Sequence, residues 1–243
     1  MYNVLTLNKI AACGTDLLDK SKYTVGDDIA NPDAILVRSA SMHEMELPAN
    51  LLAVARAGAG VNNIPIDKCS EQGVVVFNTP GANANAVKEL VIAGLLLSSR
   101  KIPAAMDWIK TLKGKGDEVG KLVEKGKSQF VGPEIMGKKL GVIGLGAIGI
   151  LVANAAAELG MDVYGADPFL SVENALKLSG KVHYVKSNKE IFEKCDYITL
   201  HVPALPDTKG MINAEAIASM KKTVRLLNFA RDTLVDEKAI IDA

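Results

Sequence analysis

A glycine-rich turn between an apolar strand and an alanine-rich helix constrains the fold more than any other feature of the sequence. Residues 140–160 read LGVIGLGAIGILVANAAAELG, with Gly144, Gly146 and Gly149 in the spacing GxGxxG. In a strand–turn–helix unit the first glycine permits a tight turn, the second lets the backbone approach a diphosphate, and the third lets the helix pack closely on the strand. The start of the helix also presents free N–H groups to phosphate oxygens. The motif therefore predicts a Rossmann-type dinucleotide site.

Asp167 strengthens this prediction and indicates which dinucleotide binds. The next apolar run, DVYGAD, ends in Asp167, and Pro168 and Phe169 follow it. A carboxylate at this place accepts hydrogen bonds from both hydroxyls of the adenosine ribose and repels a 2′-phosphate. No arginine follows that would bind such a phosphate, so we expect NAD rather than NADP as the cofactor.

Short apolar runs alternate with helical patterns along the whole chain. Most of these runs lack strict alternation of apolar and polar residues, which is typical of strands buried on both faces of a parallel sheet. Such a sheet needs helices on both faces, so the sequence predicts an α/β fold. The expected strands lie at residues 3–7, 34–39, 51–58 and 74–78 in a first domain and at 139–146, 161–167, 181–185, 196–202 and 224–230 in a second.

Between these two groups of strands, residues 85–110 have the pattern of one long helix, kinked or interrupted at Pro103. The lysine-rich run that follows is interleaved with acids and glycines, so we interpret residues 114–137 as a solvated, mobile connection; a basic docking patch is the less favoured alternative. We place the domain boundary near residues 98–101. This gives a substrate-binding domain at 1–98 and an NAD-binding domain at 99–243, both of which we expect to be incomplete.

Composition narrows the class of partner. The 28 basic and 28 acidic residues cancel, which argues against nucleic acid or an acidic membrane surface as the main partner. The three cysteines are far apart and form no CxxC pair, so we expect reduced thiols and neither a disulfide framework nor a metal site. The chain shows no signal peptide and no apolar run long enough to span a membrane. We therefore expect a cytoplasmic protein that acts on a small molecule.

Two further loops follow strands of the second domain and should face the same crevice, because ligands of open α/β sheets bind at the carboxyl ends of the strands. Both loops are therefore expected to contact the cofactor. The first loop holds His201, Val202, Pro203 and Thr208, and the second holds Phe229, Ala230 and Arg231. For Thr208 the alternative is that it only stabilises a turn or caps a helix.

Arg231 is the candidate catalytic residue. A nicotinamide cofactor implies hydride transfer, usually at a carbonyl carbon. A guanidinium suits this chemistry because it polarises the carbonyl and binds a neighbouring carboxylate bidentately. An arginine after a strand is more often a surface ion-pair partner, but its place at the predicted crevice favours the catalytic role.

The reaction also needs a group that carries the proton of the alcohol, commonly a histidine. His43 lies in a polar loop, and His183 lies in a strand that this ordering places far from the crevice. His201 lies at the crevice, but cofactor contact or packing at the end of a strand is the favoured interpretation. The chain therefore offers no good proton carrier.

Several motifs together resemble the D-isomer-specific 2-hydroxyacid dehydrogenase family, and most closely its members that oxidise 3-phosphoglycerate in serine biosynthesis. They are GKKLGVIGLGAIG, YGADP, CDYITLHVPALPDTKGMIN and RLLNFARDTLVDEKAI in the second domain, and VARAGAGVNNIPIDKCSEQGVVVFNTPG and NANAVKELVIAGLLLSSRK before it. The resemblance covers essentially the whole chain. It implies a flavodoxin-like substrate domain, a Rossmann-type NAD-binding domain and a homodimer.

The resemblance also assigns roles to single positions. Arg231 matches the arginine that binds and polarises the 2-oxo acid, and Arg38 is a better match than Arg56 for binding a substrate phosphate, with an ion pair inside the domain as the alternative. Substrate would bind in a cleft between the domains. Backbone contacts are implied for Ala147 and Ile148 at the diphosphate, for Ala57, Gly58 and Ala59 at the substrate carboxylate, and for Ala59 and residues 229–231 at the cofactor.

Two departures from the family pattern qualify the expected activity. The glutamate and the histidine that complete the family's catalytic set would lie beyond Ala243, so we expect this chain alone to turn over slowly. Asp232 stands where the family usually has glycine, and its side chain or charge is expected to disturb Arg231. Two alternatives stay open: a dehydrogenase for another D-2-hydroxy acid, and a catalytically silent protein that senses NAD.

Overall fold

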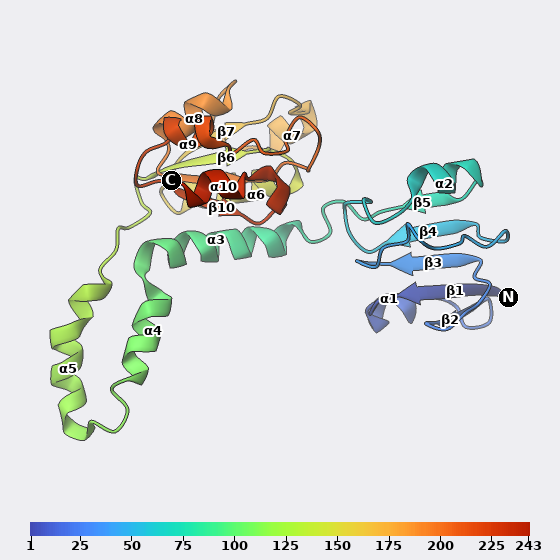
Figure 1. Cartoon of the computed structure of the whole chain (residues 1–243), viewed down its shortest axis with the longest axis horizontal. Coiled ribbons are helices and arrows are strands. Elements are labelled where there is room, and N and C mark those ends of the chain that lie inside the picture. Colours follow the sequence, from blue (N-terminus) through green and yellow to red (C-terminus); the bar gives the residue numbers. More distant parts are fainter. The chain divides into compact units, whose positions relative to one another are not determined.

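The computed structural model describes residues 1–243 and divides into two compact units, Met1–Asn83 and Ala84–Ala243. Each unit is built around a five-stranded sheet in which all neighbouring strands run parallel. The ribbon in Figure 1 shows these sheets with their helices. The prediction of parallel α/β architecture therefore holds for both units.

The first unit has the strand order β2-β1-β3-β4-β5, which is the flavodoxin-like order. Four of its strands were predicted, and β2 was missed because its four residues, YTVG, contain no apolar run. A buried core of Leu5, Ile35, Val37 and Val54 lies on one face of the sheet, together with Cys69. The elements are β1 (Tyr2–Leu7), α1 (Ala12–Thr15), β2 (Tyr23–Gly26), β3 (Ala34–Val37), β4 (Ala53–Arg56), α2 (Ile66–Glu71) and β5 (Val75–Phe77).

The second unit has the strand order β10-β9-β6-β7-β8, and all five of its strands were predicted. Counted within the unit this is 5-4-1-2-3, the order of a Rossmann sheet. The order reverses between β6 and β9, so the switch point where such folds bind ligands lies at the carboxyl ends of these two strands. The strands are β6 (Lys139–Ile143), β7 (Asp162–Ala166), β8 (His183–Tyr184), β9 (Tyr197–Leu200) and β10 (Arg225–Asn228).

Helices cover both faces of the second sheet. Buried side chains of α3 and α6 pack on one face, and those of α8 and α9 pack on the other. The helices are α3 (Ala84–Arg100), α4 (Ile102–Lys110), α5 (Val119–Gly126), α6 (Ala147–Glu158), α7 (Val172–Lys177), α8 (Asn188–Lys194), α9 (Ala214–Ser219) and α10 (Glu237–Ile241), with short 3₁₀ turns η1 (Gly116–Glu118), η2 (Lys127–Phe130) and η3 (Asp232–Leu234).

The long helix α3 belongs to the second unit by its packing. A Cβ on Gly94 would lie 3.0 Å from the Phe229 ring and 3.1 Å from Leu227, so the glycine lets α3 lie directly on β10. At the end of α3, the buried hydroxyls of Ser99 and Tyr197 form a 2.6 Å hydrogen bond. The compact units accordingly divide between residues 83 and 84, whereas the sequence placed the domain boundary near 98–101.

The helical segment after α3 is interrupted, but not at the proline itself. Lys101 adopts a left-handed conformation (φ 50°) and separates α3 from α4. Pro103 lies in the first turn of α4, where a backbone N–H would have no partner inside the helix, so the lack of an N–H in proline costs no hydrogen bond. The connection that follows contains the eight-residue helix α5, which the sequence interpretation missed. Glycines at both of its ends obscured the helical pattern.

Candidate active site

The three glycines of the GxGxxG turn each meet a different steric demand. Gly144 has φ +93°, and a Cβ there would lie 2.7 Å from the carbonyl oxygen of His201, so this glycine lets the loops after β6 and β9 touch. A Cβ on Gly149 would lie 1.8 Å from the carbonyl oxygen of Gly144, so α6 packs against the turn only without a side chain. A Cβ on Gly146 would meet nothing within 4 Å. Open space therefore faces the second glycine, as close approach of a ligand requires.

The start of α6 supplies hydrogen-bond donors to that space. Gly146 caps the helix, and no side chain accepts a bond from its first turn. The first N–H groups of a helix have no partner inside the helix and carry a partial positive charge. The amides of Ala147 and Ile148 lie in this first turn, and their binding of a diphosphate stays a prediction.

Asp167 lies at the end of β7 and holds the glycine turn in place. Its Oδ2 accepts a hydrogen bond from the N–H of Leu145 at 2.9 Å, and its Oδ1 accepts one from the N–H of Phe169 at 2.8 Å. Two carboxylate oxygens have about four acceptor positions, so the group retains capacity for ribose hydroxyls. The residues of this turn therefore fit a dinucleotide. Pro168 follows Asp167 in the same loop, and its contact with the cofactor stays a prediction.

His201 follows β9 and is partly buried behind the turn. Its Nε2 lies 3.0 Å from the hydroxyl of Thr199, which is fully buried. Burial lowers the pKa of His201 from 6.5 to about 4, so the ring is neutral at pH 7. A pKa this low makes the imidazole a weak base, and the cofactor contact or strand-end packing favoured for His201 stays a prediction.

This burial predicts a pH-dependent stability. Between pH 6.5 and about 4 the unfolded chain binds a proton at His201 that the folded chain does not. The free energy of unfolding is therefore highest above pH 6.5 and falls as the pH drops; from pH 7 to pH 5 we expect His201 to contribute a loss of about 1–2 kcal/mol. Urea denaturation of the wild type and of His201→Gln at both pH values measures this. An equal loss in the two proteins would show that His201 is not responsible.

The loop after β9 is closed by Thr208. Its hydroxyl donates to the carbonyl oxygen of Pro203 at 2.6 Å and accepts from the N–H of Leu205 at 2.8 Å. Hydrogen bonds of this kind are typical of a residue that stabilises a turn, which was the alternative to a cofactor contact for Thr208. Cofactor contacts of Val202 and Pro203, which lie in the same loop, stay predictions.

Arg231 projects from the loop after β10, at the same carboxyl edge of the sheet as the glycine turn. The side chain of Asn228 closes this loop: its Nδ2 donates to the carbonyl oxygen of Arg231 at 2.6 Å, and its Oδ1 accepts from the N–H of Ala230 at 3.0 Å. The exposed guanidinium bonds only to the carbonyl oxygen of Ala230, at 2.8 Å, and pairs with no carboxylate. Arg231 is thus a cation free to bind an anion, beside Phe229.

Asp232 does not strain this loop. Its φ is not positive, because only Asn8 and Lys101 among the non-glycine residues have positive φ. Its Oδ1 accepts a hydrogen bond from the N–H of Thr233 at 2.8 Å and forms no ion pair with Arg231. The backbone conformation at this position therefore does not require glycine, whereas hindrance of a close approach by the side chain and the effect of its negative charge stay predictions.

In the first unit, the two predicted substrate arginines have different environments. Arg38 follows β3, is exposed, and forms no hydrogen bond or ion pair through its side chain. Arg56 ends β4; its Nε donates to the carbonyl oxygen of Arg38 at 3.0 Å, and its Nη1 donates to the carbonyl oxygen of Gly60. Arg38 thus has a free guanidinium, whereas Arg56 braces the surrounding backbone.

The turn after β4 holds Ala57, Gly58 and Ala59, whose amides were predicted to bind the substrate carboxylate. The N–H of Ala57 already donates to the carbonyl oxygen of Val37 at 2.8 Å, and that of Gly58 donates to Arg56 at 2.9 Å. The amides of Ala59 and Gly60 have no partner, so they are the donors that a carboxylate could use. The sequence analysis did not select Gly60, because contacts with β3 decide which amides of this turn lack a partner.

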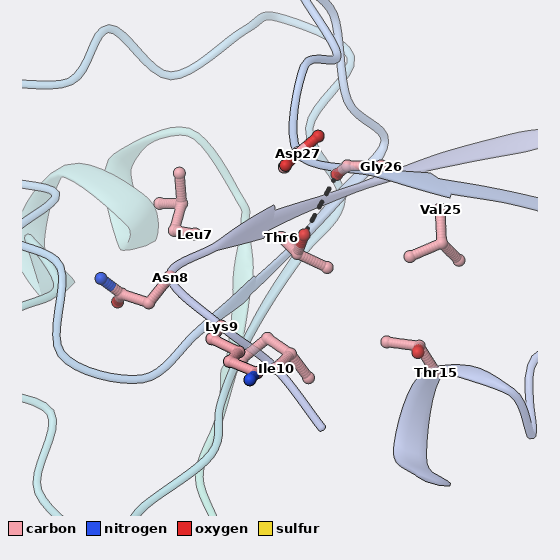
Figure 2. Close-up of a pocket in the computed structure, with 9 residues that line it drawn as sticks. All are labelled: Thr6, Leu7, Asn8, Lys9, Ile10, Thr15, Val25, Gly26 and Asp27. Carbon is pink, nitrogen blue, oxygen red and sulfur yellow. Dashed lines mark hydrogen bonds between the residues drawn. The ribbon is translucent and has the colours of Figure 1, made fainter. Parts of the chain in front are cut away.

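A cavity of about 680 Å³ opens at the carboxyl ends of β1 and β2, lined by Thr6–Ile10, Thr15 and Val25–Asp27 (Figure 2). None of the predicted site residues lines it. The two remaining histidines lie elsewhere: Nε2 of His43 is 2.9 Å from the carbonyl oxygen of Asn62, and that of His183 is 3.0 Å from Asp162 at the amino ends of β7 and β8. His183 thus lies at the amino edge of its sheet, opposite to the carboxyl edge that carries the glycine turn.

Comparison with known proteins assigns the family. Residues 92–243 match the model of the D-isomer specific 2-hydroxyacid dehydrogenase, NAD binding domain. The chain is 35% identical to D-3-phosphoglycerate dehydrogenase of Bacillus subtilis, over 100% of this chain and 46% of that protein. It is 37% identical to the enzyme of the same name from Methanocaldococcus jannaschii, over 92% of this chain and 41% of that protein.

Among solved structures, NAD⁺-bound 3-phosphoglycerate dehydrogenase of Entamoeba histolytica superposes with a TM-score of 0.76 at 28% identity, covering 99% of this chain and 76% of that chain. The protein belongs to the D-isomer specific 2-hydroxyacid dehydrogenase family. The predicted family, fold class and NAD cofactor are thereby confirmed. The chain spans less than half the length of the sequence relatives named above. None of its helices is long and apolar enough to cross a membrane.

Proposed function

We propose that the protein takes part in the NAD-dependent oxidation of 3-phospho-D-glycerate to 3-phosphohydroxypyruvate, a step of serine biosynthesis. The single observation that carries this proposal is the unpaired guanidinium of Arg231 at the same sheet edge as the GxGxxG turn. Relatives named D-3-phosphoglycerate dehydrogenase support the choice of substrate. The free thiols of Cys13, Cys69 and Cys195 fit a reducing cytoplasm.

Each residue has a definite task in this reaction. The amides at the start of α6 would hold the diphosphate of NAD and Asp167 its adenosine ribose, and the bound cofactor would supply the acceptor for the hydride on C2 of the substrate. Arg231 binds the substrate carboxylate and polarises the developing carbonyl through its planar fork of donors. The unpaired amides of Ala59 and Gly60 are further donors for the carboxylate, and Arg38 binds the phosphate.

We expect the chain to lack a good carrier for the proton of the C2 hydroxyl, because partial burial lowers the pKa of His201 to about 4 and makes its imidazole a weak base. We therefore expect the 243 residues to bind NADH well but to turn over slowly with NAD and 3-phosphoglycerate. A steady-state assay checks this expectation. Turnover in the usual range of dehydrogenases, above about 1 s⁻¹, would contradict it.

Arg38 provides the test of the substrate class. Arg38→Ala should weaken binding of 3-phosphoglycerate by about 30-fold or more, because a charge-assisted contact with the phosphate is lost, and leave D-glycerate binding nearly unchanged. Titrations with each compound in the presence of NADH measure both affinities without turnover. A similar loss for the two compounds, or no loss for either, would contradict phosphate recognition by Arg38 and favour another D-2-hydroxy acid.

The protein also forms a homodimer through the outer surface of α3 and α4. This surface exposes apolar side chains that a monomer would leave in water. The double variant Leu97→Glu, Ile109→Glu should be monomeric by analytical ultracentrifugation, whereas Leu176→Glu on α7 serves as a control that should leave the dimer intact. A monomeric wild type at micromolar concentration would contradict the proposal. The exposed residues are Leu90, Leu96, Leu97, Ile102, Met106 and Ile109.

A further inference from the structure

Asn8, the residue directly after β1, has an unusual backbone conformation. Its φ is 68°, and the only other non-glycine residue with positive φ is Lys101. Asparagine tolerates this left-handed conformation better than most residues because its short amide can hydrogen-bond locally. Such conformations persist where surrounding contacts hold them, and they cluster at functional sites. The contacts of Asn8 therefore indicate what the conformation is for.

The side chain of Asn8 reaches across to the loop after β3. Its Oδ1 accepts hydrogen bonds from the N–H groups of Ser39 at 3.0 Å and Ala40 at 2.6 Å. The regular pairing of β1 with β3 ends at Leu7 and Val37. Asn8 thus continues the connection between the two strands beyond their last paired residues, at the switch point of the flavodoxin-like sheet. Figure 2 shows it at the end of β1, beside Leu7 and Lys9.

These contacts fix the backbone that carries Arg38. Asn8 holds the two amides that follow Arg38, and Arg56 holds the carbonyl oxygen of Arg38 at 3.0 Å. The guanidinium of Arg38 itself has no partner. A cation on an immobilised backbone has less freedom to lose when it binds an anion, so its affinity is higher than that of the same side chain on a mobile loop.

We infer that Asn8 is a positioning residue for Arg38 and thereby sets the preference for a phosphorylated substrate. The inference rests on the proposed function, in which Arg38 binds the substrate phosphate. Asn8 acts only through its Oδ1, because its Nδ2 has no hydrogen-bond partner in the chain. The left-handed turn is what directs that oxygen at the loop.

Two variants separate the side chain from the backbone conformation. Asn8→Gly keeps the left-handed turn at no steric cost and removes the acceptor. Asn8→Asp keeps the acceptor and replaces the unpaired nitrogen by a second oxygen, which adds a negative charge. Hydrogen exchange should speed up about tenfold at the amides of Ser39 and Ala40 in Asn8→Gly and stay slow in Asn8→Asp. Unchanged exchange in Asn8→Gly would contradict the inference.

The functional measurement is the ratio of the dissociation constants of D-glycerate and 3-phosphoglycerate, titrated with NADH present in 0.5 M salt to screen the charge of the aspartate. Asn8→Gly should lower this ratio about fivefold or more, and Asn8→Asp should restore it to within about twofold of the wild type. A role in folding alone would weaken both ligands equally and leave the ratio unchanged, which would overturn the inference.

Arg38→Ala distinguishes failure of this inference from failure of the proposed function. If Arg38→Ala lowers the ratio and Asn8→Gly does not, Arg38 binds the phosphate without help from Asn8 and the inference is wrong. If Arg38→Ala leaves the ratio unchanged, phosphate recognition by Arg38 fails, and the inference fails with it. If Asn8→Gly does not fold, Asn8→Asp carries the test: a ratio as low as that of Arg38→Ala would overturn the inference.

Discussion

Replacing Gly149 by alanine should destabilise the second unit by about 3 kcal/mol, a large part of the stability of a small domain. The added Cβ would lie 1.8 Å from the carbonyl oxygen of Gly144, so α6 and the glycine turn have to move apart. Alanine favours the helix by about 1 kcal/mol over glycine, so any net loss arises in spite of helix propensity. Chemical denaturation monitored by circular dichroism measures the change.

Gly146→Ala is the matched control, because it adds the same methyl group three residues earlier. That methyl meets nothing within 4 Å, and Gly146 has φ −80°, which any residue adopts. The variant should therefore be as stable as the wild type but bind NADH about tenfold more weakly or worse, since the methyl stands where the diphosphate approaches the backbone. Equal NADH affinity in Gly146→Ala and the wild type would contradict the placement of the cofactor at this turn.

Arg231→Ala should weaken binding of 3-phosphohydroxypyruvate on the order of 100-fold, because a charged group of the ligand loses a bidentate partner. Titration in the presence of NAD⁺ measures this without turnover, since the oxidised cofactor has no hydride to give. Affinity for NADH should change little, because the guanidinium makes no contact with the glycine turn. Binding of the oxo acid at wild-type strength would remove Arg231 from the catalytic role.

Two neighbouring variants separate charge from geometry at Arg231. Arg231→Lys keeps the positive charge but loses the planar fork, so its affinity should fall between those of the wild type and Arg231→Ala. Asp232→Gly removes the adjacent negative charge and should strengthen oxo-acid binding by a few-fold, since the two groups are exposed and solvent screens them. A weaker affinity in Asp232→Gly would show that Asp232 supports the loop rather than opposing the anion.

The central strands β6 and β9 of the second unit were predicted well because almost all of their residues are buried. Leu140, Val142, Ile198 and Leu200 are all buried, and Thr199 is the one buried polar residue of these two strands. β2 escaped detection because it lies at the edge of its sheet with Thr24 exposed, so only part of it needs to be apolar. The other three edge strands, β5, β8 and β10, were predicted, so β2 was missed for its lack of an apolar run and not for its edge position alone.

Packing between distant segments was harder to foresee. The sequence indicated that residues 85–110 form a long helix, but not that Gly94 brings α3 onto β10 in the second unit. The eight residues of α5 were interpreted as a connection because the glycines around them outweigh a short apolar pattern. Both differences arise from contacts that no local pattern records.

The candidate site shows the same division. The spacing of Gly144, Gly146 and Gly149 was enough to predict the turn and its helix, because the spacing itself is the signature of this strand–turn–helix unit. The roles of Arg56 and Gly60 were not predictable, since they depend on which backbone groups of neighbouring strands take up their hydrogen bonds. Residue type identified the candidates, and the hydrogen bonds between strands decided among them.

A crystal structure of the protein grown with NAD⁺ tests the central claim most directly. It should show the diphosphate against Gly146 and the amides of Ala147 and Ile148, with the adenosine ribose on the carboxylate of Asp167. Electron density for the dinucleotide at another place, with the turn after β6 free of ligand, would contradict the assignment of this turn and the functions derived from it.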